Sequence, residues 1–565
     1  MNALQVSAGH FFSISCVKFF YADNSMELCL RNLKLLVMRG KITMVLMMVA
    51  LISCSKEGKV SAGRDLDYDY GKHLSHDAIV LGDRLENPYK TENITKALQS
   101  LYPTKADRVD VRTTDLYVRF LPADEKEYET LTALGLNLTD YPLDYEILVD
   151  GDWYHDPEIA EGNVTWQYAV VSPDFEFPDI RHEVIDECHI SENDAGTRSD
   201  GIDWDEVERE AYRITGNERM LSSLETKAGK KGEKVVPSGR ITIVDAQIND
   251  GKPVGVAGVR VSCNTFVKFD DAYTDENGYY RMDKKFSADL NYKLVFKNEK
   301  GFAIGVNLVL VPASVSTLGK AGPEGVNMTV TEQSEDKLFN RCVVNNAVYD
   351  YMKRCDENDM DIGFPPSDLR IWIFHSLRAS SAVMLHHGAV VDNEIFRKFL
   401  GEFSPLVKFL LPDITLGLKD DDTYADIYSS TCHELAHASH FAKAGREYWE
   451  EYIYYILESF VKTGGVAYGD GTGKRAGYCE VGEMWGYYLE SKMYKDRYGG
   501  GFPTFGNSFW FKPQIFRYLD ERGMTCSDMF SVMNGDVTTK TDLENALIKA
   551  FPAKKTVIGQ AFDRY

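Results

Sequence analysis

The most informative pattern in the chain is a pair of histidines, His433 and His437, with a glutamate directly after the first. The stretch reads His433-Glu434-Leu435-Ala436-His437. On a helix, residues i and i+4 lie on one face, so both imidazoles could reach one metal ion. Two neutral histidines suit Zn²⁺ and leave positions open, and Glu434 could take a proton from a water there. We therefore predict a hydrolytic zinc centre with Glu434 as the general base.

The residues before this motif are typical of a helix that begins near residue 424. Three aspartates at 420–422 bring negative charge to the helix start, and Thr423 is a good N-cap residue. Small side chains such as Ala438 allow another element to pack closely. We expect a helix over residues 424–444 that carries both histidines on one face.

A third protein ligand must come from elsewhere in the chain, because catalytic zinc sites use three protein ligands. The metzincin pattern would place Gly and His where this chain has His440 and Lys443, so that class is excluded. Two carboxylates, Glu480 and Glu483, lie one turn apart in the apolar stretch 478–490, where an unpaired charge would be costly. Helical periodicity favours Glu480 as the more inward-facing, and from the residues alone both carboxylates stay candidates.

The region 424–490 resembles the core of the gluzincin zinc peptidases. Its segment Glu483-Met-Trp-Gly-Tyr is similar to the Glu-x-aromatic-small-x pattern around the zinc-binding glutamate of several gluzincins. The resemblance implies that Zn²⁺ is held by His433, His437 and Glu483. It also implies that Gly486 lets this helix approach the zinc helix closely.

Two departures limit what the resemblance implies. A gap of 45 residues separates His437 from Glu483, longer than in thermolysin-like enzymes, so the substrate pocket and the subclass do not carry over. No downstream motif for an oxyanion-stabilising side chain is present; Tyr487 could serve, although packing in the core is the favoured interpretation. Residues 413–419 lie where such enzymes carry their substrate-pairing edge strand, and we expect that strand here.

The pattern along the whole chain predicts a multidomain protein. Residues 335–565 have a helical apolar period and predict the mostly helical, zincin-like domain that must position the motif. Short β-branched strands with an Asn-Gly turn at 277–278 predict a small β-sandwich over residues 238–315. Residues 76–222 predict an α+β domain of unknown role, in which the acidic stretch 203–212 is expected as a solvated helix.

The predicted sandwich resembles the carboxypeptidase regulatory-like (transthyretin-like) domain. The resemblance rests on Gly258-Val-Arg-Val and on the later run Thr274-Asp-Glu-Asn-Gly-Tyr-Tyr. In that family the module is a scaffold or an interaction domain, so the resemblance implies no chemistry for this part of the chain.

The N-terminal region predicts export. Residues 38–53 combine a positive start with an eleven-residue apolar core, which is too short to span a bilayer and is typical of a signal peptide. The run Leu-Ile-Ser-Cys54 resembles a bacterial lipobox, which implies that Cys54 is acylated and anchors the protein to the outer membrane, on the periplasmic or cell-surface side. Residues 54–75 are expected to be a flexible tether, and residues 1–37 a non-native upstream extension. The whole chain resembles a Bacteroidetes lipoprotein family.

The charge of the chain argues against one class of partner. Acidic residues outnumber basic ones 86 to 63, a formal net charge of −23, so the surface repels nucleic acid. Two functions stay open: a membrane-anchored zinc metallopeptidase acting on a peptide or protein substrate, and a non-catalytic surface lipoprotein that binds glycan or protein ligands and carries a degenerate peptidase domain. The intact Glu434 favours the peptidase, because a purely structural zinc site needs no general base.

Overall fold

The computed structural model describes most of the chain from residue 78 onward. The described residues are 78–104, 106, 109–160, 163–194, 201–221, 234–305, 315–334, 336–356, 360–374, 380–388, 412–419, 421–463, 468–500 and 509–565. The expected extension 1–37, signal peptide 38–53, lipidated Cys54 and tether 54–75 lie outside them.

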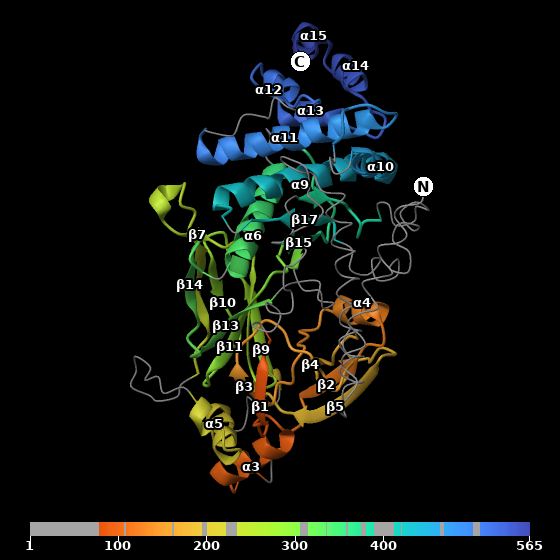
Figure 1. The fold of residues 1–565 in the computed structure, drawn as a ribbon. Helices are drawn as coiled ribbons and strands as arrows, with labels where there is room; N and C mark the ends of the chain where they lie inside the picture. Colours follow the sequence, from red (N-terminus) through yellow and green to blue (C-terminus); the bar gives the residue numbers. More distant parts are fainter. Residues whose placement is uncertain are drawn as a thin grey trace, which may run out of the picture. The chain divides into compact units, whose positions relative to one another are not determined.

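The first described segment combines helices with two small antiparallel sheets. Strand β1 (Val80–Arg84) pairs with β3 (Tyr145–Val149), and β2 (Asp115–Leu121) lies between β4 (Gln167–Val171) and β5 (Arg181–Cys188). The helices are α3 (Thr91–Leu101), α4 (Glu125–Ala133) and α5 (Trp204–Ile214), and α3 packs against α5 (Figure 1).

Helix α5 differs from the solvated helix expected at residues 203–212. Its apolar side chains Val207, Ala211 and Tyr212 are buried, and so is the carboxylate of Glu208. The prediction of a solvated helix was wrong because it relied on the acidic composition of this stretch. The apolar residues recur with a helical period and form one face, which packs against α3.

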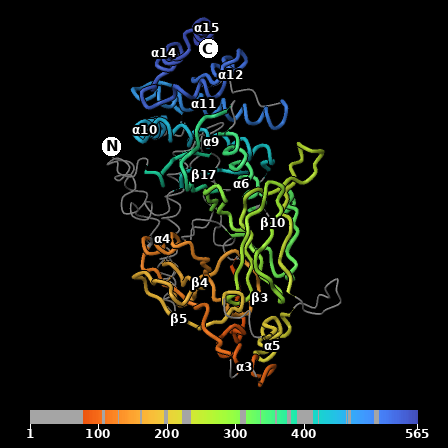
Figure 2. Tube along the Cα trace, turned by 180° about the vertical axis from the view of Figure 1, so that it is seen from behind, coloured from red at the N-terminus to blue at the C-terminus, as the bar shows by residue number. Residues whose placement is uncertain are grey.

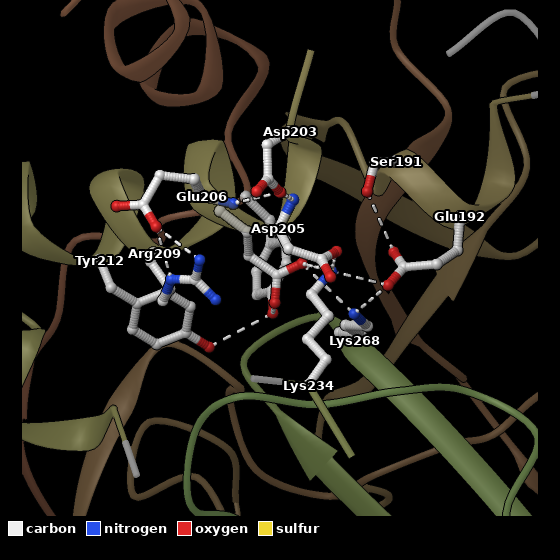
Figure 3. Close-up of polar contacts among 11 residues, drawn as sticks. Ser191, Glu192, Asp203, Asp205, Glu206, Arg209, Tyr212, Lys234 and Lys268 are labelled. Atoms are coloured by element: carbon white, nitrogen blue, oxygen red, sulfur yellow. Dashed lines mark hydrogen bonds and ion pairs between the residues drawn. The ribbon is translucent and has the colours of Figure 1, made fainter. Parts of the chain in front are cut away.

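Two buried lysines explain why the carboxylate of Glu208 can be buried on α5. Lys234 and Lys268 both point toward Glu192 (Figure 3), with Nζ atoms 2.9 Å and 2.7 Å from its Oε1. The same two ammonium groups lie 2.8 Å and 3.3 Å from Oε2 of Glu208. Both lysine side chains are almost fully buried, and each charge therefore has opposite charges within hydrogen-bonding distance. Since Lys268 belongs to β9 (Lys268–Tyr273), the network joins α5 to the following sheets.

Eight strands within the described residues 238–305 and 315–330 form two four-stranded sheets. The first sheet has the order β10 (Tyr279–Arg281), β6 (Ser238–Ile243), β14 (Asn327–Val330), and the short strand β7 (Val254–Gly255) also pairs with β6. The second sheet has the order β13 (Val315–Ala321), β11 (Leu290–Val295), β8 (Arg260–Thr265), β9. The turn before β10 needs glycine, because Gly278 has φ +83° and a Cβ there would lie 1.9 Å from the carbonyl oxygen of Ile241.

A further four-stranded sheet precedes the C-terminal helices. Its order is β12 (Ala303–Gly305), β15 (Arg370–Phe374), β17 (Ile414–Gly417), β16 (Ser381–Ala382), and only β16 runs antiparallel to its neighbour. The prediction that 413–419 is an edge strand was therefore wrong. Strand β17 lies inside the sheet because 380–382, which precede it by some thirty residues in sequence, pair with its outer side.

The rest of the described chain is helical. The helices are α6 (Asp336–Cys355), α9 (Tyr424–Ala444), α10 (Arg446–Thr463), α11 (Ala476–Tyr498), α12 (Gln514–Asp520), α13 (Cys526–Ser531), α14 (Lys540–Ala550) and α15 (Lys555–Arg564). Helix α9 packs against α6, α10 and α11, which lie beside it in both views (Figures 1 and 2). None of the helices described is both long enough and apolar enough to cross a bilayer. The chain thus combines helices with several antiparallel sheets in a multidomain-like α+β arrangement.

Candidate metal centre

Helix α9 carries the histidine motif and begins where the sequence predicts. Thr423 is its N-cap: the Thr423 hydroxyl accepts from the backbone N–H of Asp426 (3.3 Å), and the Asp426 carboxylate accepts from the backbone N–H of Thr423 (3.0 Å). This capping box confirms the predicted cap. Further along the helix, His433, Glu434 and His437 are all buried.

Helix α11 brings a carboxylate to the two imidazoles. Glu483 is fully buried, with Oε2 3.6 Å from Nε2 of His433 and Oε1 3.6 Å from Nε2 of His437. The close approach depends on Gly486, one turn later. A Cβ at that position would lie 2.9 Å from Cε1 of His437 and 3.0 Å from Cε1 of His433. Only glycine leaves room for both imidazoles against this helix.

The three side chains have the spacing of metal ligands. The two Nε2 atoms are 3.1 Å apart, and each lies 3.6 Å from an oxygen of Glu483. A tetrahedral ion with bonds of about 2.1 Å holds its ligand atoms about 3.4 Å apart, which falls within this range. In the part of the chain that the structure describes, this is the one group of three or more His, Cys, Asp or Glu side chains placed to hold a metal ion.

Glu480 does not join this group. It is half-buried on α11, where burial raises the pKa of its carboxyl and Lys540, at the start of α14, acts in the opposite direction. Helical periodicity alone therefore indicated the wrong carboxylate as inward-facing. The side of α11 that meets α9 is the one with Glu483 and Gly486, and that side depends on tertiary packing.

Two buried groups, Glu490 and Tyr452, contact the candidate ligands, and the sequence analysis missed both of these roles. The Oε2 atom of Glu490 lies 3.1 Å from Nδ1 of His433, and the Tyr452 hydroxyl donates to Oε1 of Glu483. Glu490 comes two turns after Glu483 on α11, so the shared helical face was the one available signal. Such contacts fix the orientation of metal ligands and tune their basicity.

The electrostatics of the group suit a cation. Burial lowers the pKa of His437 to about 3, so this imidazole is neutral at ordinary pH. Burial acts the same way on His433, but Glu483 and Glu490 outweigh it and raise the pKa of His433 to about 10. For Glu483, burial raises the pKa, and the two histidines with Tyr452 outweigh it and lower the pKa to about 2. A metal ion that binds here must therefore displace a proton from His433.

Aromatic rings surround the two histidines. The ring of Tyr487 lies 4.5 Å from that of His433, and Trp449 lies 5.6 Å from His437. Trp449 also donates from Nε1 to the carbonyl oxygen of Ala382 on β16 (3.0 Å). His440, which stands where metzincins have glycine, packs on Tyr448 and Trp449 and does not join the ligand group.

Comparison with known proteins adds little to this geometry. No family model matches the chain, and no curated protein matches it. Among solved structures, a crystal structure of (S)-allantoin synthase is similar over 23% of this chain and 48% of that chain, with 12% identity and a TM-score of 0.11. The chain thus spans about half the length of that protein. A TM-score this low carries no argument about fold or activity.

Proposed function

We propose that the protein is a zinc metallopeptidase that hydrolyses peptide bonds, with residues 335–565 as a zincin-like domain, and that acylated Cys54 anchors it to the outer membrane. The observation that carries the proposal is the buried triangle of His433, His437 and Glu483, with Glu434 directly after the first ligand. The neighbouring β-sheets at 238–330 would serve as the scaffold that a carboxypeptidase regulatory-like module provides.

The donor set supports zinc. Two imidazoles and one carboxylate are the protein ligands of a catalytic zinc site, which keeps a fourth position open, whereas Ca²⁺ and Mg²⁺ prefer sets of oxygen ligands. The spacing of the donor atoms also fits a tetrahedral ion. When bound, zinc supplies Lewis acidity, which lowers the pKa of water and polarises a carbonyl group.

The protein's own groups divide the remaining work. Glu434 follows His433 on α9, so its carboxylate is rotated away from the ligand face and can act on a water beside it. We assign it as the general base that takes a proton from water and then passes that proton to the leaving amine. Glu490 and Tyr452 act as positioning residues, because they hold His433 and Glu483 in place.

Two measurements on the purified protein test the proposal together. Mass spectrometric metal analysis should find roughly one zinc per chain, as expected for a His₂Glu site. A peptide library should show cleavage that a chelator abolishes and added zinc restores. Stoichiometric zinc without any cleavage would instead support the non-catalytic binding protein, and absence of zinc would contradict both the metal site and the peptidase.

A further inference from the structure

A cleft separate from the metal centre lies where the segment 137–153 faces the sheet β13-β11-β8-β9. It has a cavity volume of about 100 Å³ and is partly open to solvent. Its walls mix aromatic rings, carboxamides and charged side chains, including Tyr141, Trp153, Arg260 and Lys293. None of these residues belongs to the His433 group.

The sheet contributes its polar face to the cleft. Along β8, Val261 and Cys263 are buried in the core, whereas the alternating residues Arg260, Ser262 and Asn264 line the cleft. Strand β11 shows the same alternation, and its Asn291 and Lys293 line the cleft. Because successive side chains of a strand point to opposite faces, these polar residues share the cleft side of the sheet, where Phe269, Val295 and Val315 add apolar surface.

The cleft wall contains an arginine, Arg260, whose Nε lacks an acceptor among the described residues. Arg260 donates from Nη1 to Oδ1 of Asn137 at 3.4 Å, a long contact, while its buried Nε has no acceptor within the described chain. Arg260 forms no ion pair with any carboxylate that the structure describes. The Nζ of Lys293 lies 4.1 Å from the centre of the Tyr141 ring. Lys293 also interacts electrostatically with the carboxylate of Asp140. Arg260 is therefore left to pair with an anion from outside.

Two further donors in the cleft wall lack acceptors. Tyr141 is 2% exposed, and its buried hydroxyl has no hydrogen-bond partner in the described part of the chain. The same holds for the buried Nε1 of Trp153. Since buried polar groups are normally hydrogen-bonded, three buried donors without acceptors in the described chain, all in the wall of one cleft, are unusual, and a ligand with several oxygen atoms could satisfy those that it reaches.

We propose that this cleft binds an acidic saccharide, a sugar ring that carries a carboxylate. The planar guanidinium of Arg260 matches a carboxylate, which accepts two parallel hydrogen bonds from it. Carboxamides such as Asn291 and Gln167 can pair with ring hydroxyls, and the aromatic rings provide apolar surface for the C–H faces of the sugar. On a protein with a net charge of −23, an anion needs a local cation to offset the repulsion. The cleft lining also holds two carboxylates: Asp152 is paired with Arg341 (3.2 Å), and Asp140 interacts electrostatically with Lys293, so Arg260 is the cation available to the anion.

Calorimetric titration of the purified protein tests this proposal independently of the metal site. The probes are D-glucuronate and N-acetylneuraminate, with glucose as the neutral counterpart, hexanoate as a carboxylate without hydroxyls, and inorganic phosphate as a different anion. We expect saturable binding of at least one sugar acid and at least tenfold weaker binding of glucose, hexanoate and phosphate. Arg260→Gln should weaken sugar-acid binding by about ten- to a hundredfold, as expected for a lost charge-assisted hydrogen bond.

The matched control is Arg281→Gln, which removes an exposed arginine from β10 in the other sheet and should leave the affinity unchanged. The thermal midpoints of both variants report whether they fold. Equal affinity for glucose and glucuronate, or for hexanoate and glucuronate, would overturn the proposal, as would tightest binding of phosphate. These comparisons use wild-type protein, so they decide the matter even if Arg260→Gln does not fold. No measurable binding of either sugar acid would also overturn it.

Discussion

The Oε2 atom of Glu490 lies 3.1 Å from Nδ1 of His433, while Nε2 of the same imidazole faces Glu483. One ring thus connects two carboxylates of α11 through its two nitrogens. The contact fixes which nitrogen of His433 points toward the candidate metal position, and it raises the basicity of that nitrogen. The role of α11 is therefore wider than supplying one ligand.

The first prediction follows from this contact. Glu490→Gln keeps the shape of the side chain and removes its charge, so the metal site should weaken by about ten- to a hundredfold. Competition with a chelator of known affinity measures the change. Asp496→Asn, which alters a carboxylate near the end of the same helix at its pairing with Arg354, is the matched control and should bind metal like the wild type. Equal affinity in Glu490→Gln and wild type would show that the contact has no role in ligand positioning.

The third ligand can be identified by a pair of variants. Glu483→Ala should reduce the zinc content from roughly one per chain to a small fraction, because two histidines alone hold zinc poorly. Glu480→Ala removes a half-buried carboxylate one turn away and should keep its zinc. Metal analysis of both purified variants gives the answer. Full zinc content in Glu483→Ala would remove this residue from the site.

Gly486 provides a steric test of the close approach between α9 and α11. Gly486→Ala would place a Cβ 2.9 Å from His437, so one imidazole or the helix has to move, at a cost of about 1–3 kcal/mol for overpacking. We expect a lower thermal midpoint and weaker metal binding, although alanine is the better helix former. Gly482→Ala is the matched control on the same helix, since its Cβ would meet Tyr452 at an ordinary 3.4 Å. If the two variants behaved alike, the helices would not be held as closely as described.

The local features of the site could be predicted from the sequence, and the non-local ones could not. The helix at 424–444, its Thr423 cap and the shared face of His433 and His437 depend on residues within a few positions of one another, and the structure has them all. The choice between Glu480 and Glu483 depended on which side of α11 meets α9, and helical periodicity alone indicated the wrong side.

Other errors have the same physical origin. The position of β17 inside its sheet is set by pairing with β16, which comes from a distant part of the chain. The burial of Glu208 is set by Lys234 and Lys268, which follow it by more than twenty residues. Neither contact leaves a local pattern in the sequence, so the inner position of β17 and the burial of Glu208 could not be predicted from neighbouring residues, whereas the apolar face of α5 could have been.

The network around Glu192 predicts a dependence of stability on acid. Burial by itself raises the pKa of Glu192, but Lys268 and Lys234 outweigh it and lower the pKa from its ordinary 4.5 to about 2. The stabilisation is therefore fully present above pH 4.5 and is lost as the pH falls from 4.5 toward 2. Glu192→Gln should lower the free energy of unfolding by about 1–3 kcal/mol at pH 7, the range for a hydrogen bond to a charged group.

The difference in unfolding free energy between Glu192→Gln and wild type is the decisive measurement. This difference should shrink as the pH falls from 4.5 toward 2, because the wild type loses the ion pairs of Glu192 in that range. Glu218→Gln, at an exposed carboxylate near the end of α5, should show almost no effect at either pH. A difference between Glu192→Gln and wild type that stayed constant from pH 7 to the acid limit would contradict the assigned pKa.

The general base gives the sharpest test of the proposed mechanism. Glu434→Gln preserves the shape of the side chain and leaves His433, His437 and Glu483 in place, so fold and zinc content should survive. It removes the group that takes the proton from water, so peptide cleavage should fall by about 10²- to 10⁴-fold. His433→Ala, in contrast, should lose zinc and activity together. A Glu434→Gln variant that cleaved the same peptide at nearly the wild-type rate and at equal zinc content would contradict the assignment of Glu434 as the base. The proposed mechanism would then have to be abandoned.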